Sequence, residues 1–248
     1  MKEINYKIWT LTDGSQGMIS QVIGLAKELG EDILQIKTDL HFPWSFLQPG
    51  ILPTFKWVFK NNIPYNNKPK IVISCGRRSV YLSIFLKKKF KDIINIHIQN
   101  PKISFNNFNY IVAPNHDNIS AENVINSVGA LHKFSSEIIS NAKNVQSINK
   151  KNLVTCIIGG QNQHYNFGIN EAEDLCSKLK NLKNNNSNIN LLVLTSRRTI
   201  DTIKNILKRN LSSLSTIWLG EGHNPYEFAL KYSTHFIVTA DSTSMISE

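Results

Sequence analysis

Short apolar runs alternate with amphipathic stretches along most of this 248-residue chain. Mostly apolar runs bounded by turn residues predict buried β-strands, and apolar residues at helical spacing, such as Ile19, Val22 and Ile23, predict helices between them. The predicted strands are residues 7–11, 32–36, 70–74, 93–98, 110–113, 153–158, 190–194, 215–219 and 235–239. Helices are predicted up to about residue 29, up to about 89, over about 170–182, after 199 and from 225.

The order of these elements predicts the fold class. Strands and helices alternate with short loops, which is typical of α/β proteins with parallel sheets and right-handed crossovers. Residues 129–152 are polar and weakly patterned, so we expect two domains, residues 1–135 and 136–248. The sequence ends at Glu248, within the first turns of an expected helix, which predicts that the second domain is incomplete.

The charge of the chain favours anionic partners. The net charge is +10 and the pI is near 9.5, which suits phosphorylated metabolites or an acidic lipid surface. No nucleic-acid-binding module is recognisable, so nucleic acid is not an expected partner. The first residues form no signal-peptide core, and no apolar run is long enough to span a bilayer. We therefore expect a cytoplasmic protein, at most peripheral to the inner face of the membrane.

Cysteine and histidine show no metal-binding spacing. Cys75, Cys156 and Cys176 are far apart, which is typical of small core residues in a reducing compartment. The histidines form no ligand pattern either. We therefore expect neither a metal nor a bound cofactor.

Seven groups of residues resemble the mitochondrial fission family named for elongated mitochondria. Their order and spacing across nearly the whole chain make the resemblance specific. They are Leu11-Thr12-Asp13-Gly14 with Gly17, Gln21 and Gly24-Leu25-Ala26; Gly76-Arg77-Arg78; Ala113-Pro114-Asn115-His116-Asp117; Gly159-Gly160; Thr195-Ser196-Arg197-Arg198-Thr199; Asn224-Pro225-Tyr226; and Thr239-Ala240-Asp241-Ser242 with Ser244-Met245-Ile246-Ser247-Glu248.

The resemblance implies two Rossmann-like domains, similar to those of the GT-B glycosyltransferases, which bind nucleotide sugars between such domains. Plant members of the family are linked to mitochondrial division and recruit a dynamin-related protein. Bacterial members have no mitochondria to divide, so that role cannot be ancestral. The resemblance therefore implies a nucleotide-sugar donor on the second domain and an acceptor on the first, with Gly14 and Gly17 among the binding residues.

Residues 241–248 combine a strand end with a helix start. Backbone N–H groups and hydroxyls of Ser242 and Ser244, next to Asp241, suit a diphosphate at a positive helix end. Glu248 lies where GT-B enzymes, by the resemblance, present a carboxylate to the ribose. The alternative is an ordinary Asp/Ser N-cap with an acidic residue in the first turn.

Two further loops of the second domain suit a phosphate. Gly159-Gly160 either admits a phosphate close to the backbone or makes a tight turn. Ser196 precedes Arg197 and Arg198, whose guanidinium groups bind diphosphates through paired hydrogen bonds. Solvated charge is the alternative, although cations at a helix start are electrostatically unfavourable.

The first domain offers candidates for acceptor binding and for a general base. Arg77 and Arg78 repeat the basic helix start of the second domain. Asp13 follows the first strand, and His116-Asp117 follows the last one, so these are candidate bases for removing the acceptor proton. Some family members carry His at the position of Met18, which cannot move a proton. His116 could instead simply cap a helix.

Residues 42–60 combine aromatic side chains with Lys56 and Lys60. Such a composition suits a membrane interface, and it equally suits a helix packed across the domain. In the first case we expect Trp44, Phe55 and Trp57 to be partly exposed and to touch lipid.

These observations favour a metal-independent, nucleotide-sugar-dependent glycosyltransferase acting on cell-envelope or lipid-linked glycans. Two alternatives stay open: a non-catalytic interaction protein, as in plant fission, and a sugar-nucleotide epimerase on the same fold.

Overall fold

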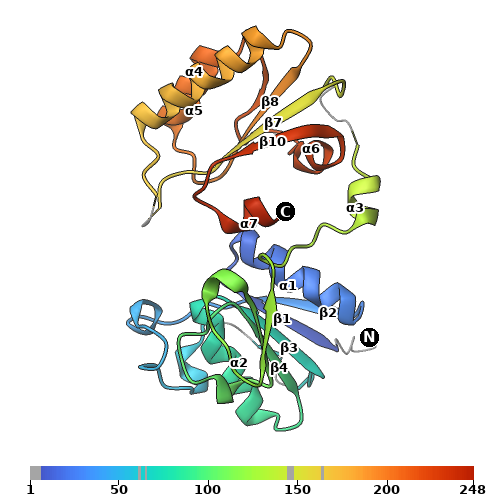
Figure 1. Ribbon diagram of the computed structural model, residues 1–248. Helices are drawn as coiled ribbons and strands as arrows, with labels where there is room; N and C mark the ends of the chain where they lie inside the picture. Colours follow the sequence, from blue (N-terminus) through green and yellow to red (C-terminus); the bar gives the residue numbers. More distant parts are fainter. Residues whose placement is uncertain (1–6, 61–62, 65, 144–147, 163–164) are drawn as a thin grey trace. The chain divides into compact units, whose positions relative to one another are not determined.

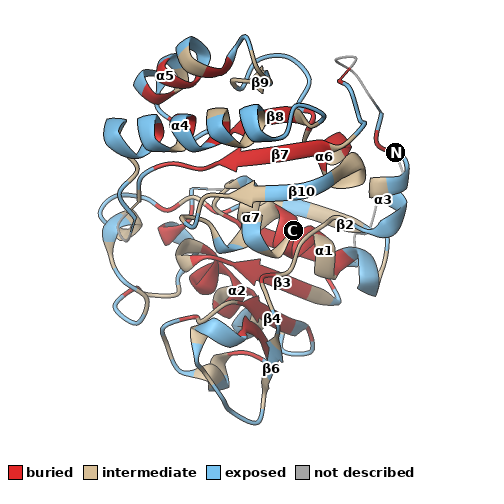
Figure 2. Ribbon diagram, turned by 45° about the horizontal axis from the view of Figure 1, so that its top comes forward, coloured by how far each residue is buried: buried red, intermediate tan, exposed pale blue. Residues whose placement is uncertain are grey.

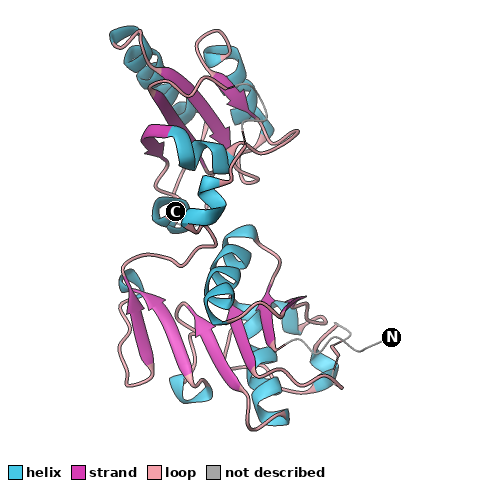
Figure 3. Cartoon of the chain, turned by 90° about the vertical axis from the view of Figure 1, so that its right-hand side faces the viewer, coloured by secondary structure: helices cyan, strands magenta, loops and turns pink. Residues whose placement is uncertain are grey.

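The computed structural model describes residues 7–60, 63–64, 66–143, 148–162 and 165–248. Two earlier expectations concern residues outside these ranges: the absence of a signal-peptide core in residues 1–6, and the absence of a metal-binding pattern at His164. The chain divides into two compact units, Met1–Phe134 with Ser247–Glu248 and Ser135–Ile246. Figure 1 labels the elements of both units, and Figure 3 separates helices from strands by colour.

The first unit contains a six-stranded sheet in the order β2-β1-β3-β4-β5-β6. Every neighbouring pair in this sheet is parallel, so all six strands end at the same edge. The elements are β1 (Ile8–Thr12), α1 (Gln16–Leu29), β2 (Ile33–Lys37), the 3-10 helices η1 (Trp44–Phe46) and η2 (Lys56–Val58), β3 (Ile71–Cys75), α2 (Arg77–Lys89), β4 (Ile94–Ile98), η3 (Phe105–Asn107), β5 (Tyr110–Pro114), η4 (Asn115–Asp117) and β6 (Val124–Ser127).

Two apolar clusters form the core of this unit, because alternate strand residues point to opposite faces of the sheet. In one cluster, α1 packs Val22 and Ala26 against Ile73 and Ile98. In the other, Leu82 and Leu86 of α2 lie with the buried residues Trp9 and Val72. The sheet is therefore covered on both faces, as expected for parallel strands.

The second unit has a four-stranded parallel sheet in the order β10-β7-β8-β9. Burial differs between its strands: β7 is buried along its length, whereas β10 at the edge has three exposed and three partly buried residues (Figure 2). The elements are α3 (Ser136–Ser140), β7 (Leu153–Ile158), α4 (Ile169–Asn185), β8 (Asn190–Thr195), α5 (Asp201–Leu211), β9 (Thr216–Trp218), α6 (Tyr226–Tyr232), β10 (Ser233–Val238) and α7 (Thr243–Ser247).

Helices cover both faces of this second sheet. Cys176 of α4 and Leu207 of α5 lie in one cluster with Cys156 of β7. Phe228 of α6 packs in another with Leu192 of β8. The predicted α/β class with two parallel sheets is confirmed.

Each predicted strand corresponds to an observed one, with boundaries shifted by one or two residues in most cases. Two short elements, β6 and α3, were not predicted because they are brief and contribute few apolar residues to the core. For residues 42–60 the sequence offered a packed helix as one of two interpretations, and that interpretation is wrong. That segment contains only η1 and η2, each three residues long, because Pro43, Pro49 and Pro53 interrupt a continuous helix.

The three cysteines are free and buried, as expected for core residues. Burial raises the pKa of the Cys156 thiol to about 12, so this thiol is unreactive at neutral pH. Within the described ranges, no helix is both long and apolar enough to cross a bilayer. The described His, Cys, Asp and Glu residues likewise form no cluster of three that could hold a metal ion.

Candidate functional site

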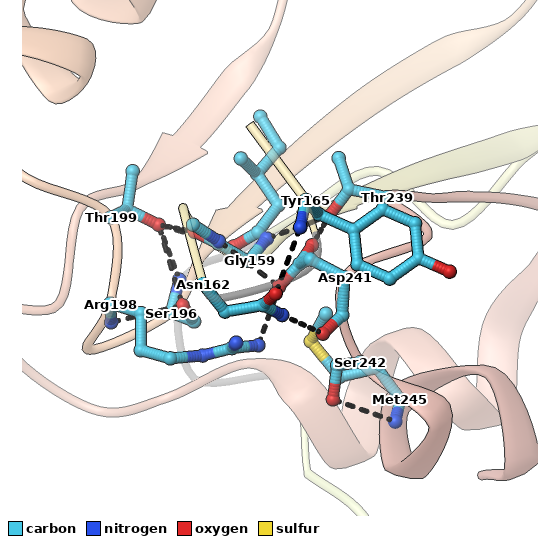
Figure 4. Close-up of polar contacts among 12 residues, drawn as sticks. Gly159, Asn162, Tyr165, Ser196, Arg198, Thr199, Thr239, Asp241, Ser242 and Met245 are labelled. Atoms are coloured by element: carbon cyan, nitrogen blue, oxygen red, sulfur yellow. Dashed lines mark hydrogen bonds and ion pairs between the residues drawn. The ribbon is translucent and has the colours of Figure 1, made fainter. Parts of the chain in front are cut away.

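Three loops meet at the carboxyl edge of the second sheet. They follow β7 at Gly159-Gly160, β8 at residues 196–199 and β10 at residues 239–241. Since β10 and β8 both pair with β7 in parallel, their loops flank the glycines on either side. Figure 4 shows side chains from all three loops in contact. Ligands of open α/β sheets bind at this edge.

The Asp241 carboxylate joins the three loops. Its Oδ2 accepts a hydrogen bond from the Gly160 backbone N–H at 3.1 Å, and the Arg198 guanidinium lies 2.5 Å from the same oxygen. Its Oδ1 accepts from the Thr239 hydroxyl at 2.5 Å. Only 4% of the Asp241 side chain is exposed, whereas 41% of Arg198 is. Asp241 therefore connects the three loops from within, and its carboxylate already accepts from three donors.

Two threonine hydroxyls complete the network. Thr239 Oγ1 accepts from the Gly159 backbone N–H at 2.8 Å. Thr199 Oγ1 accepts from the Ser196 backbone N–H at 3.0 Å and donates to the Gly159 carbonyl at 2.5 Å. These contacts satisfy both backbone groups of Gly159, so the loop after β7 is held rigidly between its neighbours.

The two glycines are required by close packing. A Cβ on Gly159 would lie 1.9 Å from Asp241 Oδ2, and a Cβ on Gly160 would lie 2.3 Å from the Arg198 carbonyl oxygen. Both distances are far below van der Waals contact. The backbone N–H groups of Gly159 and Gly160 bond to Thr239 and Asp241 in this structure. A phosphate would therefore have to displace those bonds or use other donors.

The two adjacent arginines differ in their surroundings. Arg198 is paired with Asp241, and its backbone N–H donates to Ser196 Oγ at 3.1 Å. Arg197 is exposed, and its guanidinium has no ion pair or hydrogen bond with any described residue. Of the two guanidinium groups, that of Arg197 is thus available to an external anion.

The start of α7 has the geometry of an ordinary N-cap. The Ser242 hydroxyl accepts from the Met245 backbone N–H at 3.5 Å, the capping contact that the sequence offered as the alternative to a ligand site. Ser244 is partly buried in the same helix. Glu248 is grouped with the first unit, where Ser20 of α1 donates to its carboxylate at 3.2 Å.

In the first unit, Asp13 and Asp117 both lie near Cys75 at the carboxyl edge of the sheet. Burial raises the pKa of the Cys75 thiol, and the negative charges of Asp13 and Asp117 raise it further. Each carboxylate also supports a turn: Asp13 accepts from the Ser15 N–H, and Asp117 from the Asn100 N–H, both at 2.9 Å.

The two carboxylates nevertheless follow strands that are not neighbours. β3 and β4 lie between β1 and β5, so the strand ends are three spacings, about 14 Å, apart. His116 Nε2 lies 3.9 Å from Asp117 Oδ1. Asp13 and the His116–Asp117 pair are therefore alternative candidates for deprotonating an acceptor hydroxyl.

The arginines at the start of α2 have partners within the unit. Arg77 donates to the backbone carbonyls of Ser45, at 2.8 Å, and Phe46, at 3.3 Å. Arg78 Nη1 lies 3.6 Å from Asp39 Oδ1. These contacts account for the two cations at a helix start without a ligand.

The predicted binding glycines of this unit lie beside the same edge. Gly14 has a φ of 92°, in the region that favours glycine, and lies two residues after the end of β1. Gly17 lies in the first turn of α1. Gly76, which precedes Arg77, has a φ of 89° and packs against Met18, whose Sδ would lie 2.4 Å from an added Cβ. Met18 thus serves packing at this position.

Thr199, Thr239 and Asn162 belong to the second-unit network but were not predicted as site residues. Asn162 Nδ2 donates to the Asp241 carbonyl at 2.8 Å. All three lie just after strand ends or the glycine pair, which is the signal that could have found them. The backbone groups that these three residues contact lie in loops that are far away in sequence, so the contacts themselves could not be predicted.

Comparisons with known proteins agree with this fold. Residues 16–248 match the sequence model of a family described as mitochondrial fission ELM1. An uncharacterized protein of Rickettsia prowazekii, RP120, is 29% identical and aligns with 97% of this chain and 79% of its own length. The mitochondrial fission protein ELM1 of Arabidopsis thaliana is 25% identical over 73% of this chain, and the match spans only about half, 49%, of the plant protein.

Solved structures show the same fold at low sequence identity. A UDP-GlcNAc 2-epimerase from Neisseria meningitidis bound to UDP-GlcNAc has a TM-score of 0.56 and 12% identity, over 97% of this chain and 79% of its own. The MnaA–UDP complex of S. aureus has a TM-score of 0.54 and 13% identity, over 98% and 76%. The two parallel α/β units are thus of the GT-B-like, Rossmann type.

Proposed function

We propose, since this chain belongs to the mitochondrial fission ELM1 family, that it is a nucleotide-sugar-dependent glycosyltransferase. In this proposal the second unit, Ser135–Ile246, holds the donor diphosphate at the carboxyl edge of β7, β8 and β10. The first, within residues 1–135, holds the acceptor, a cell-envelope or lipid-linked glycan. Arg77, Arg78, Gly14 and Gly17 are assigned to the acceptor side.

One observation carries the proposal: Arg197 is exposed next to a rigid loop cluster whose other cation is already neutralised. Arg198 and Asp241 form an internal pair, so Arg197 adds a full positive charge at this edge of the sheet. A guanidinium binds phosphate oxygens bidentately and stabilises a departing diphosphate. The two solved structures described above carry UDP-GlcNAc or UDP on a similar fold, which supports a diphosphate as the anion.

The proposed reaction is a glycosyl transfer. The acceptor oxygen forms a bond to the anomeric carbon as the bond between that carbon and the diphosphate oxygen breaks. The nucleoside diphosphate leaves with the electron pair, and Arg197 stabilises its charge. The acceptor proton passes to Asp13 or to the His116–Asp117 pair. Ser242 and Ser244 are assigned to donor binding, whereas Glu248 belongs to the first unit and accepts a hydrogen bond from Ser20 there.

Ligand-induced stabilisation tests donor binding directly. The chain is heated with UDP, GDP, ADP and their common sugar conjugates. A nucleotide at 100 times its dissociation constant adds about 2.7 kcal/mol to the free energy of unfolding. Arg197→Ala is expected to lower the affinity for the nucleotide tenfold or more, because it removes the exposed guanidinium. Arg209→Ala is the matched control, since Arg209 is an exposed arginine of the same unit on α5, and it should bind like the wild type.

A sugar-nucleotide epimerase is the second candidate, because the solved structures of similar fold described above include a UDP-GlcNAc 2-epimerase. The two activities differ in their need for an acceptor. An epimerase changes the sugar of a bound UDP-sugar without any acceptor, and NMR of the nucleotide sugar detects the new epimer. A transferase releases nucleoside diphosphate only when an acceptor is present.

Failure of every nucleotide to stabilise the chain would overturn both enzyme proposals. The remaining candidate is then an interaction protein, as the similarity to the plant fission protein suggests.

A further inference from the structure

The excess positive charge of the chain is confined to one stretch. The chain has 28 Lys and Arg and 18 Asp and Glu residues. Ten of the basic residues and none of the acidic ones lie in residues 40–91, so the rest of the chain is balanced at 18 of each sign. A charge confined in this way marks a surface of the first unit rather than a property of the whole protein.

The same stretch exposes large apolar side chains. The exposed fractions are 78% for Phe42, 74% for Phe46, 66% for Ile51, 58% for Phe55 and 57% for Trp57. We refer to the four aromatic residues of this set, Phe42, Phe46, Phe55 and Trp57, as the aromatic patch. Single exposed apolar residues are common, but a cluster of this size on one short segment marks an interaction surface.

Ring contacts organise the patch. Phe42 meets Phe46 edge to face with centroids 6.1 Å apart, and Phe55 stacks on Trp57 at 6.0 Å. Trp44 contacts Trp57 at 5.4 Å and packs against the core cluster beneath. The exposed rings therefore rest on one another and on the core, and do not extend singly into solvent.

Side chains of α2 hold this segment along the helix. Arg77 in the first turn binds the Ser45 and Phe46 carbonyls, and Tyr81 donates to the Gln48 carbonyl at 2.9 Å. Lys88 in the last turn donates to Thr54 Oγ1 at 2.9 Å. The segment, light blue in Figure 1, thus follows α2 from its start to its end. Its far end meets the basic run Lys87–Lys88–Lys89.

Buried residues anchor the segment from below. Leu52, Val58 and Phe59 are buried in the core, and Phe59 forms an antiparallel bridge with Leu40. These anchors fix the backbone, so the exposure of the patch is built into the fold. Aromatic side chains next to lysines are typical of surfaces that sit at the membrane–water interface.

We propose that the aromatic patch and the basic end of α2 bind the surface of an anionic lipid bilayer. The rings enter the boundary between headgroups and acyl chains, while Lys89 and Lys91 attract the anionic headgroups. A bilayer is favoured over a nucleic acid because the exposed set includes the aliphatic Ile51 and the rings pack in pairs, whereas binding of single strands uses aromatic rings on which successive bases stack. This proposal does not depend on the proposed function.

Vesicle flotation tests the proposal with the complete chain. Vesicles of phosphatidylcholine alone are compared with vesicles that also contain the anionic lipid phosphatidylglycerol. Strong binding is expected only to the anionic vesicles, with a loss on addition of salt. The double variant Phe46→Ser/Trp57→Ser is expected to bind the anionic vesicles at least tenfold more weakly than the wild type. The double variant Lys89→Gln/Lys91→Gln is expected to bind the anionic vesicles about fivefold more weakly for each charge removed.

Matched controls are available elsewhere on the chain. Val128→Ser/Ile200→Ser removes two other exposed apolar side chains, and Lys178→Gln/Lys208→Gln removes two other exposed lysines. Both should bind vesicles like the wild type. Circular dichroism checks that each variant is folded. A measurement on the wild type needs no variant: brominated lipids should quench tryptophan fluorescence, because Trp57 would lie within the acyl boundary.

Three results would overturn the proposal. One is equal loss of binding in the patch and control variants. Another is binding to a single-stranded oligonucleotide but not to vesicles. The third is a concentration-dependent dimer that the patch variants abolish, without vesicle binding, since the patch would then pair two copies of the chain.

Discussion

Arg198 on the loop after β8 and Asp241 on the loop after β10 form an ion pair, with Nη2 2.5 Å from Oδ2. The pair spans the end of β7, where Gly160 donates its backbone N–H to the same carboxylate oxygen. A cation that the sequence offered as a phosphate ligand is therefore part of the framework of the site, and its neighbour Arg197 faces solvent.

Removal of the Asp241 side chain is expected to destabilise the second unit. Asp241→Ala leaves the Gly160 N–H, the Thr239 hydroxyl and Arg198 without their acceptor, which costs about 1–3 kcal/mol. Urea unfolding followed by circular dichroism measures the loss. Asp174→Ala is the control, because Asp174 pairs with Lys178 on the exposed face of α4, and a surface pair contributes about 0–1 kcal/mol. Equal effects of the two substitutions would contradict the organising role of Asp241.

Gly160→Ala is expected to distort the loop after β7. The new Cβ would meet the backbone carbonyl of Arg198, which cannot move aside as a side chain can. We expect a destabilisation of about 1–3 kcal/mol and a loss of nucleotide-induced stabilisation. Gly168→Ala is a milder comparison, since its Cβ would approach only the end of the Glu171 side chain, at 3.2 Å. Thermal unfolding with and without nucleotide measures both effects. A Gly160→Ala protein as stable as Gly168→Ala would contradict the packing argument.

The base assignment predicts which carboxylate matters for turnover. Asp13→Asn and Asp117→Asn each keep an oxygen that can accept from Ser15 or Asn100, so the turns should persist. Because the two residues are three strand spacings apart, only one substitution should slow transfer, by about 10²- to 10⁴-fold. Nucleotide affinity should be unchanged in both.

Initial rates of nucleoside diphosphate release test this, with Asp32→Asn as a control for an exposed carboxylate paired with Lys7. Full activity in both variants would exclude Asp13 and Asp117 as bases. Loss in both would show that they act together despite their separation.

His97 on β4 predicts a pH-dependent stability of the first unit. Burial lowers the pKa of His97 from 6.5 to about 3, and the Ser74 hydroxyl lies 2.8 Å from its Nδ1. The unfolded chain takes up a proton below pH 6.5, whereas the folded one does not until about pH 3. Stability therefore falls as the pH decreases through this window, by about 1.4 kcal/mol per pH unit.

Comparison of the unfolding free energy at pH 5 and pH 7 isolates this contribution. His97→Gln should reduce the difference between the two pH values, because the glutamine side chain does not titrate. His235→Gln, which removes an exposed histidine of β10, should leave the difference unchanged. Identical pH profiles for wild type and His97→Gln would contradict the prediction.

Much of the fold follows from local pattern. The strand 153–158 is apolar except for Thr155 and is buried along its length in the structure. Residues such as Val22 and Ala26 recur at helical spacing and face the sheet. The strand β6 shows where pattern fails: it has only four residues, two of them apolar, and it is held by pairing with β5.

The sequence alone determined the alternation of strands and helices, and with it the edge of each sheet at which Asp13, Gly159 and Asp241 lie, because parallel strands all end at one edge. The tertiary structure decided how those residues are used. Arg198 and Asp241 are 43 residues apart, and Arg77 and Ser45 are 32 apart, so no local pattern links them. Which loops become neighbours depends on the order of strands in the sheet. Only that order distinguishes Arg198, which pairs with Asp241, from the exposed Arg197.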